Sequence, residues 1–167
     1  MATPAVAQDV QPTRLDAIMQ TITADEQPVR SSYASLADAV AAQSLDDLDD
    51  ETSCMAGAIY FESKGEPLTG QLAVANVILN RVRSGRFAST ICSVVTQRGQ
   101  FSFVREGRVP DIADCAYYRT AIAVARVAMA DAWQSPAAGA LFFHARRIAP
   151  GWRHEQIATI GNQVFYR

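Results

Sequence analysis

The sequence has no long hydrophobic run, since every apolar stretch is interrupted within about ten residues, whereas a bilayer-spanning helix needs about 20. No stable membrane insertion is therefore expected. Cysteine and histidine are also scarce: there is no C-x-x-C pair, and neither histidine stands at ligand spacing to Cys54, Cys92 or Cys115. Zinc sites need such spacing, so we expect no metal and no other cofactor. The three cysteines allow one disulfide with one thiol left over, or remain buried as small apolar side chains.

A complete secretory signal is also missing, because no basic and apolar regions precede the Ala-Val-Ala at positions 5–7. That tripeptide is nevertheless typical of a signal cleavage site, so we expect a signal-peptide remnant and export to the periplasm or cell envelope. Residues 1–50 are rich in Ala, Asp, Gln, Ser, Thr and Pro, with short apolar patches such as "SYASLADAVAA" that favour at most a loose helix. We expect 1–50 to be a flexible leader and 51–167 to be one packed, monomeric domain.

Basic residues are scarce in the first part of the chain, and acidic residues are scarce in the second. Residues 1–66 hold twelve acidic and three basic residues, and residues 67–167 hold five acidic and twelve basic ones. A cationic second half suits an anionic polymer, either nucleic acid or a cell-wall glycan with lactyl and peptide carboxylates, although scattered solvated arginines give the same count. No nucleic-acid-reading motif is present, so nucleic acid is not an expected partner.

Three segments predict helices. The first begins near "DDLDDETS", whose acidic and hydroxyl residues suit a helix N-terminus, and Gly65 ends it. Pro67 opens the second, whose apolar residues recur at helical spacing as far as Gly85. The third covers residues 111–133, and "TICSVV" favours a short helical turn between the two. Because "ALFFHARR" and "IATIGNQVFYR" favour short strands or extended loops, we expect a mainly α fold with a small irregular or β-containing wall.

A carboxylate follows directly after an uncharged stretch that runs from Cys54 to Phe61. On a helix, Glu62 shares a face with the apolar side chains of Ala58 and Ile59. Loss of water favours the neutral form of an acid, so Glu62 is a candidate general acid with a raised pKa. An ordinary helix-end glutamate bonded to a neighbour fits the spacing equally well.

Other polar residues near these helices are expected to be structural. Glu66 stands four residues after Glu62, which invites comparison with the carboxylate pairs of glycosidases. Since Gly65 and the following proline place Glu66 at a helix exit, we expect it to occupy the N-terminus of the next helix. We expect Asn80 and Arg81 to hold the fold and not the substrate.

Several motifs together resemble one family. "YFESKGEPLTGQLAVANVILNRV", "ICSVV", "QFSF", "LFFHA" and the final "IGNQVFYR" are similar to the cell-wall hydrolases of the spore-cortex-lytic (SleB-like) type, over about residues 52–167. The resemblance implies a lysozyme-like, lytic transglycosylase-like helical fold and a catalytic domain acting on peptidoglycan glycan strands. It also implies that Glu62 is the catalytic acid.

By this resemblance the reaction is cleavage of the β-1,4 bond between N-acetylmuramic acid (MurNAc) and N-acetylglucosamine (GlcNAc). In a lytic transglycosylase the nucleophile is the muramyl 6-hydroxyl, so one acid/base residue suffices and a 1,6-anhydro ring forms. A muramidase that uses water is one alternative. A non-catalytic glycan-binding or regulatory domain of the same shape is the other.

The motifs also suggest residues that bind substrate: Ser63, Gln100, Phe101, Ser102, Phe103 and His144. Gln100 and Ser102 offer hydrogen bonds to N-acetyl groups, and Phe101 and Phe103 alternate with them, so that one pair faces a cleft and the other the core. Core packing of the phenylalanines and a loop-stabilising bond of Gln100 are the structural alternatives. His144 either bonds a sugar, orients a cleft residue or is a satisfied structural histidine.

The cysteines depart from the family pattern. Gram-negative relatives often have a cysteine soon after "QFSF", where this chain has Val-Arg-Glu at 104–106. Pairing of Cys92 with Cys115, with Cys54 or with neither therefore stays open.

Overall fold

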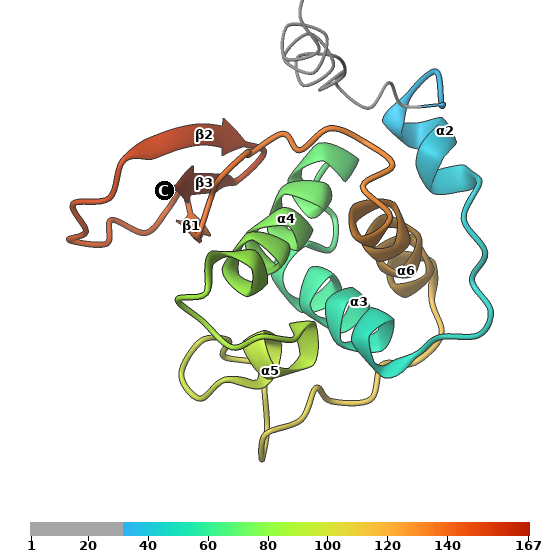
Figure 1. Ribbon diagram of the computed structural model, residues 1–167, viewed down its shortest axis with the longest axis horizontal. Coiled ribbons are helices and arrows are strands. Elements are labelled where there is room, and N and C mark those ends of the chain that lie inside the picture. Colours follow the sequence, from blue (N-terminus) through green and yellow to red (C-terminus); the bar gives the residue numbers. More distant parts are fainter. Residues whose placement is uncertain (1–31) are drawn as a thin grey trace, which may run out of the picture. The chain divides into compact units, whose positions relative to one another are not determined.

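The computed structural model describes residues 32–167. Figure 1 shows the helices and the small sheet as labelled ribbons. The elements are α2 (Leu36–Ala41), α3 (Asp50–Ser63), α4 (Leu68–Ser84), α5 (Ile91–Thr96), α6 (Ala116–Met129), β1 (Phe142–Ala145), β2 (Gln156–Ile160) and β3 (Gln163–Tyr166). The predicted mainly helical architecture with a small β wall is thus present.

Helix α3 begins and ends where the sequence predicts. The side chain of Asp49 is its N-cap and accepts a 2.7 Å hydrogen bond from the backbone N–H of Thr52. Acidic residues follow in the first turn, where they suit the positive end of the helix dipole. Gly65, with φ of +83°, turns the chain away after the last helical residue.

Helix α4 is the central element. It follows Pro67 and ends at Gly85, which adopts the left-handed conformation with φ of +67°. All ten residues from Gly70 to Leu79 are buried, because α4 separates two cores. One core lies among the helices, and the other joins Val74 and its neighbours to the sheet. Among residues 32–167, no helix is long and apolar enough to cross a membrane.

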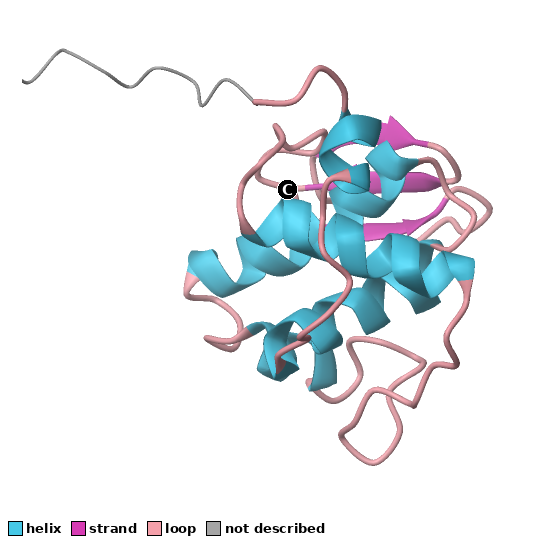
Figure 2. Cartoon of the chain, turned by 90° about the vertical axis from the view of Figure 1, so that its right-hand side faces the viewer, coloured by secondary structure: helices cyan, strands magenta, loops and turns pink. Residues whose placement is uncertain are grey.

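The three strands form an antiparallel sheet in the order β1-β3-β2, seen as magenta arrows in Figure 2. Phe143 of β1 pairs with Phe165 of β3, and their rings stack with centroids 5.9 Å apart. Phe165 is fully buried in the core between α4 and the sheet. This packing fixes the sheet on α4 and so sets which residues of β1 and β3 face the end of α3.

A disulfide joins α3 to α5. Cys54 and Cys92 are bonded with their Cα atoms 5.2 Å apart, which leaves Cys115 as a free thiol. Beside the disulfide, the Glu51 carboxylate accepts hydrogen bonds from the backbone N–H groups of Ile91, at 2.7 Å, and Cys92, at 3.3 Å. The structure therefore resolves the pairing that the sequence left open.

Three boundaries differ from the predictions, and one of them is the end of α6, at Met129 instead of residue 133. Helix α2 falls inside the predicted leader, yet Leu36 and Ala39 are buried in the helical core, because their i, i+3 spacing places both on the face toward α6. Residues 1–31 of the predicted leader, which hold the signal remnant, lie outside the described residues. Helix α6 begins at Ala116, five residues later than predicted, because residues 111–114 are mostly exposed and no buried face supports another turn.

Candidate active site

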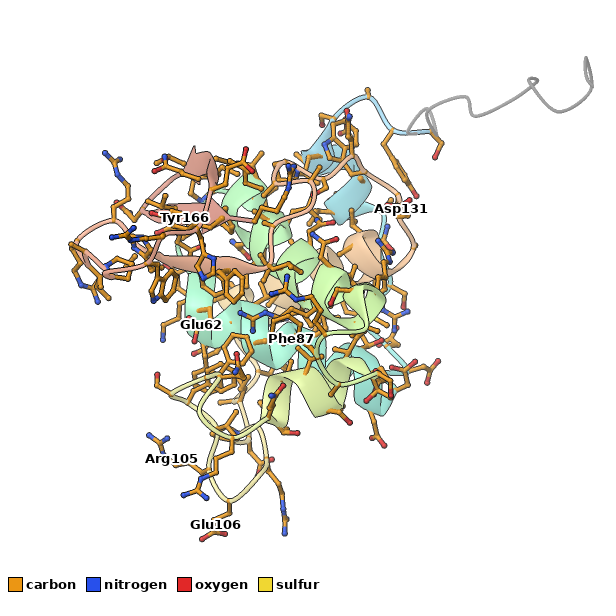
Figure 3. All side chains as sticks on the ribbon, turned by 60° about the vertical axis from the view of Figure 1, so that its left-hand side comes forward. Glu62, Phe87, Arg105, Glu106, Asp131 and Tyr166 are labelled. Carbon is orange, nitrogen blue, oxygen red and sulfur yellow. A yellow bond between two sulfur atoms is a disulfide. The ribbon has the colours of Figure 1, made fainter. Side chains whose placement is uncertain are left out.

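A cavity of about 610 Å³ lies at the C-terminal end of α3. Its wall comes from α3, α4, the loop after α5 and the sheet, and includes Glu62, Arg81, Gln100, Ser102, His144 and Trp152. Figure 3 shows Glu62 between the sheet, which carries Tyr166, and the loop that carries Arg105 and Glu106. Segments distant in the sequence thus meet around Glu62.

Glu62 is half-buried, and the loss of water raises the pKa of its carboxyl above the ordinary value of 4.5. The positive charge of Arg81 opposes this shift without cancelling it. Within the described part of the chain, the Glu62 carboxylate forms no hydrogen bond and no ion pair. The group can therefore carry a proton and present it to a bound molecule, as the sequence predicts for a general acid.

Arg81 stabilises the fold and also places a positive charge in the cavity wall. Its Nε donates a 2.8 Å hydrogen bond to the Leu141 carbonyl, and Nη1 donates to Gln100 Oε1 at 3.3 Å. Asn80 likewise donates to the Ala140 carbonyl at 3.0 Å, so the predicted structural role of both residues is confirmed. Burial lowers the pKa of Arg81 to about 10, which leaves it charged at neutral pH. Its electrostatic effect on Glu62 has no sequence signal, because the two side chains stand on different helices.

Glu66 lines the same cavity, but both of its oxygens are engaged. Oε2 accepts a 2.9 Å hydrogen bond from the backbone N–H of Asn162, and Oε1 accepts one from Asn162 Nδ2 at 3.1 Å. Glu66 directly precedes Pro67, the N-cap of α4, and so stands at the N-terminus of that helix as predicted, although the helix has no side-chain cap hydrogen bond. The turn at Gly161, with φ of +56°, brings the Asn162 donors to the carboxylate instead. Glu62 is thus the cavity-lining carboxylate that stays unengaged in residues 32–167.

Gln163 was missed as a site residue, although it lies in the quoted "IGNQVFYR". Its Nε2 donates a 2.8 Å hydrogen bond to the backbone carbonyl of Glu62. The last carbonyls of a helix lack intrahelical donors, so this bond satisfies one of them and fixes the C-terminal end of α3 to β3. Only the tertiary fold brings the two residues together.

The "QFSF" loop contributes as predicted in part. Gln100 and Ser102 are exposed and line the cavity, while Phe101 lines it with only 7% of its surface exposed. Phe103 is buried and stacks on Phe61 with ring centroids 4.8 Å apart, and it does not line the cavity. The polar pair therefore faces the cleft, Phe101 borders it and Phe103 faces the core, which corrects the substrate-binding role predicted for Phe103.

The structure contradicts a substrate-binding role for Ser63. This side chain is buried, and its hydroxyl donates a 2.8 Å hydrogen bond to the Ile59 carbonyl one turn earlier. A helix advances about 100° per residue, so the residue after Glu62 points away from the face that carries the acid. Ser63 belongs to the core side of α3.

His144 lines the cavity with both ring nitrogens engaged. Nδ1 lies 2.9 Å from the Ala145 carbonyl, and Nε2 lies 2.8 Å from the Tyr166 hydroxyl. A carbonyl can only accept, so Nδ1 donates, and in the neutral ring Nε2 accepts the Tyr166 proton. The arrangement favours the orienting role among the predicted alternatives, since His144 fixes Tyr166 on the same sheet face. Tyr166 and the nearby Trp152 were not predicted.

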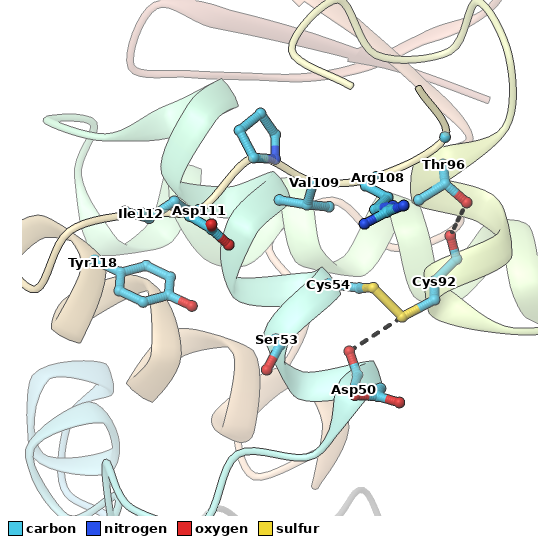
Figure 4. Close-up of a pocket in the computed structure, with 12 residues that line it drawn as sticks. Asp50, Ser53, Cys54, Cys92, Thr96, Arg108, Val109, Asp111, Ile112 and Tyr118 are labelled. Carbon is cyan, nitrogen blue, oxygen red and sulfur yellow. Dashed lines mark hydrogen bonds between the residues drawn. A yellow bond between two sulfur atoms is a disulfide. The ribbon is translucent and has the colours of Figure 1, made fainter. Parts of the chain in front are cut away.

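A second cavity, of about 690 Å³, lies near the N-terminal half of α3 (Figure 4). The disulfide borders it, together with Asp50, Arg108 and Tyr118. None of the predicted site residues lines it. Within residues 32–167 there is also no group of three or more His, Cys, Asp or Glu that could hold a metal ion. The first cavity is therefore the candidate active site.

Comparison with known proteins gives the class and then the family. The catalytic domain of the germination-specific lytic transglycosylase SleB from Bacillus anthracis superimposes with a TM-score of 0.62 at 33% identity, covering 73% of this chain and 98% of that one. The Bacillus cereus SleB catalytic domain gives 0.58 at 31% identity, covering 73% and 94%. The predicted fold class is confirmed. Residues 65–166 match the cell wall hydrolase family, and the chain belongs to it.

Curated relatives agree. The spore cortex-lytic enzyme of Bacillus cereus is 38% identical over 117 residues, which are 66% of this chain and 42% of that protein. The enzyme of Halalkalibacterium halodurans is 35% identical over 122 residues, 70% of this chain and 34% of that protein. The chain thus spans less than half the length of these relatives, and the predicted SleB-like resemblance is confirmed.

Proposed function

We propose that this chain cleaves peptidoglycan glycan strands at the MurNAc–GlcNAc β-1,4 bond, as a lytic transglycosylase with Glu62 as general acid and then base. The observation that carries the proposal is a single unengaged, half-buried carboxyl with a raised pKa in a cavity lined by polar and aromatic side chains. The neighbouring carboxylate, Glu66, is held by Asn162. The names of the similar SleB domain and spore cortex-lytic enzymes support the same chemistry.

One acid is enough for this reaction. Glu62 gives its proton to the bridging oxygen as the bond from that oxygen to muramyl C1 breaks, and the GlcNAc end leaves as an alcohol. The 6-hydroxyl oxygen of the same muramyl residue then bonds to C1, and its proton returns to the Glu62 carboxylate. Arg81 stabilises that carboxylate between the two transfers, since its positive charge favours the ionised form.

The other cavity residues bind the strand. Gln100 and Ser102 present an amide and a hydroxyl to N-acetyl groups, while the exposed face of Trp152 suits the apolar face of a sugar ring. A peptidoglycan substrate lies outside the cytoplasm, so the enzyme acts after export, in the periplasm or cell envelope. We also propose that it works as a monomer.

Product analysis on purified sacculi tests the proposal. The native chain and Glu106→Gln, whose exposed carboxylate lies outside the cavity, should release fragments ending in 1,6-anhydromuramic acid, each lighter by one water than a reducing end. Glu62→Gln should release none while keeping the native circular dichroism spectrum. Reducing ends would show the water-using muramidase instead. Binding without any cleavage by the native chain would show a glycan-binding domain.

A further inference from the structure

The loop between β1 and β2 carries an excess of positive charge beside the cavity. Three of its residues are arginines: Arg146, Arg147 and Arg153. The acid in the loop, Glu155, is paired with Arg167 at 3.7 Å. Within residues 32–167, none of the three loop guanidinium groups forms a hydrogen bond or an ion pair. Three cations without a protein anion are available to a ligand.

Trp152 fixes this loop against the sheet. Its indole ring is 47% exposed, yet it meets four aromatic rings edge-on at centroid distances of 5.7 to 6.2 Å. These rings belong to Phe142, His144, His154 and Tyr166. Edge-to-face contacts of this kind stabilise one ring orientation. The loop cations therefore hold a defined place at the rim of the cavity.

The three arginines differ in where they stand. Arg147 lines the cavity that contains Glu62, whereas Arg146 and Arg153 do not. Arg81, the other arginine of the cavity wall, is buried and donates to Leu141 and Gln100. Within the described residues, Arg147 is thus the cavity-lining cation with its donors unused.

We infer that Arg147 forms a carboxylate subsite, through which the enzyme selects strands whose muramyl residues carry negative charge. The inference rests on the proposed glycan-cleaving function. A guanidinium presents two parallel N–H groups that match the two oxygens of a carboxylate. On a muramyl strand that carboxylate belongs either to the free lactyl group or to the peptide stem attached to it. A strand whose carboxylates are neutralised leaves Arg147 hydrated and gains nothing from it.

Two matched pairs of substrates show whether the carboxylate that binds Arg147 belongs to the lactyl group or to the peptide stem. The first pair is peptide-free strands with free lactyl carboxylates and the same strands converted to methylamides by carbodiimide coupling. The second is peptide-bearing strands before and after the same conversion. With a lactyl source, the native chain should cleave the charged member of the first pair with about tenfold higher kcat/KM, the size of one charge-assisted contact. With a stem source, the difference should appear in the second pair.

Arg147→Gln should remove that difference by lowering kcat/KM on the charged member alone, and Arg153→Gln should keep it. Arg147→Lys, which retains the charge without the paired donors, should give an intermediate preference and serves if the glutamine variant does not fold. Equal cleavage of both members of both pairs by the native chain would overturn the inference, as would equal losses in Arg147→Gln and Arg153→Gln. Failure of the native chain to cleave any of the four substrates would instead remove the proposed function.

Discussion

The acids at the two ends of α3 have pKa values that are shifted in opposite directions. At the N-terminal end, the Thr52 N–H donates to Asp49 and holds the pKa of that carboxyl below its ordinary value of 3.8. At the C-terminal end, burial raises the pKa of Glu62 above 4.5. The helix dipole acts in the same sense at both ends, since it favours negative charge at the N-terminus and disfavours it at the C-terminus. The two acids of one helix thus have pKa values shifted in opposite directions, according to their hydrogen bonds and burial.

The two cavities repeat this contrast. One borders the disulfide near the N-terminal half of α3, where Cys54 ties the helix to α5. The other, of similar volume, contains Glu62, whose carboxylate has no partner in the described chain. The unengaged ionisable group with a perturbed pKa makes this second cavity the candidate active site.

The largest expected effect is on catalysis. Glu62→Gln should lower the rate of glycan cleavage by about a hundredfold to ten-thousandfold, because it removes the proton donor and leaves the cavity shape intact. The initial rate of anhydromuramyl product release from sacculi measures it. Asp49→Ala, at the other end of α3, should keep the native rate at a temperature where it remains folded. A similar loss in both variants would break the contrast between the two ends.

The disulfide should dominate stability at the N-terminal half of α3. Replacing Cys54 and Cys92 together by serine should lower the free energy of unfolding by about 3 to 4 kcal/mol on the chain-entropy account, given their sequence separation of 38 residues. Urea unfolding followed by circular dichroism measures it. Cys115→Ser, which removes the free thiol, is the matched control and should change little. An unchanged midpoint in the double variant would contradict the bond.

Loss of the N-cap should cost stability in a pH-dependent way. Because the folded state lowers the pKa of Asp49, its ionised form stabilises the fold above the ordinary value of 3.8, and that contribution disappears as the pH falls through the folded pKa. Asp49→Ala should therefore have a lower thermal midpoint than the native chain at pH 7, and the gap should narrow below pH 3.8. Midpoints from calorimetry across this range test the sign, and a gap that widens in acid would refute it.

The smallest expected effect is the contribution of Glu62 to the pH dependence of stability, and its sign is opposite to that of Asp49. The folded state raises the pKa of Glu62, so stability is full below the ordinary value of 4.5 and declines as the pH rises through the folded pKa. Glu62→Gln removes this decline, and its thermal midpoint should exceed that of the native chain at pH 7 and match it in acid. Calorimetry at both pH values gives the comparison. A less stable glutamine variant at pH 7 would mean that Glu62 is ionised and paired.

Much of the helical frame could be predicted. The N-terminus of α3 and the limits of α4 follow from acidic caps, Pro67 and glycines that need positive φ, all of which act within a few residues. The start of α6 could not, because the exposure of residues 111–114 depends on what packs there. At the site, Glu62 stood out by its apolar neighbours, while Ser63 was misplaced because adjacency in a motif is not adjacency on a helix face.

The sequence by itself determined where α3 and α4 begin and end, that a short β wall follows the helices, and that one acid ends an apolar helix, because caps, turns and periodicity are local. Only the tertiary structure decided that Asn162 engages Glu66, that Gln163 anchors the carbonyl of Glu62, and that Arg81 charges the cavity wall. These contacts join residues far apart in the chain. Their energies depend on distance and burial in three dimensions, which no local pattern encodes.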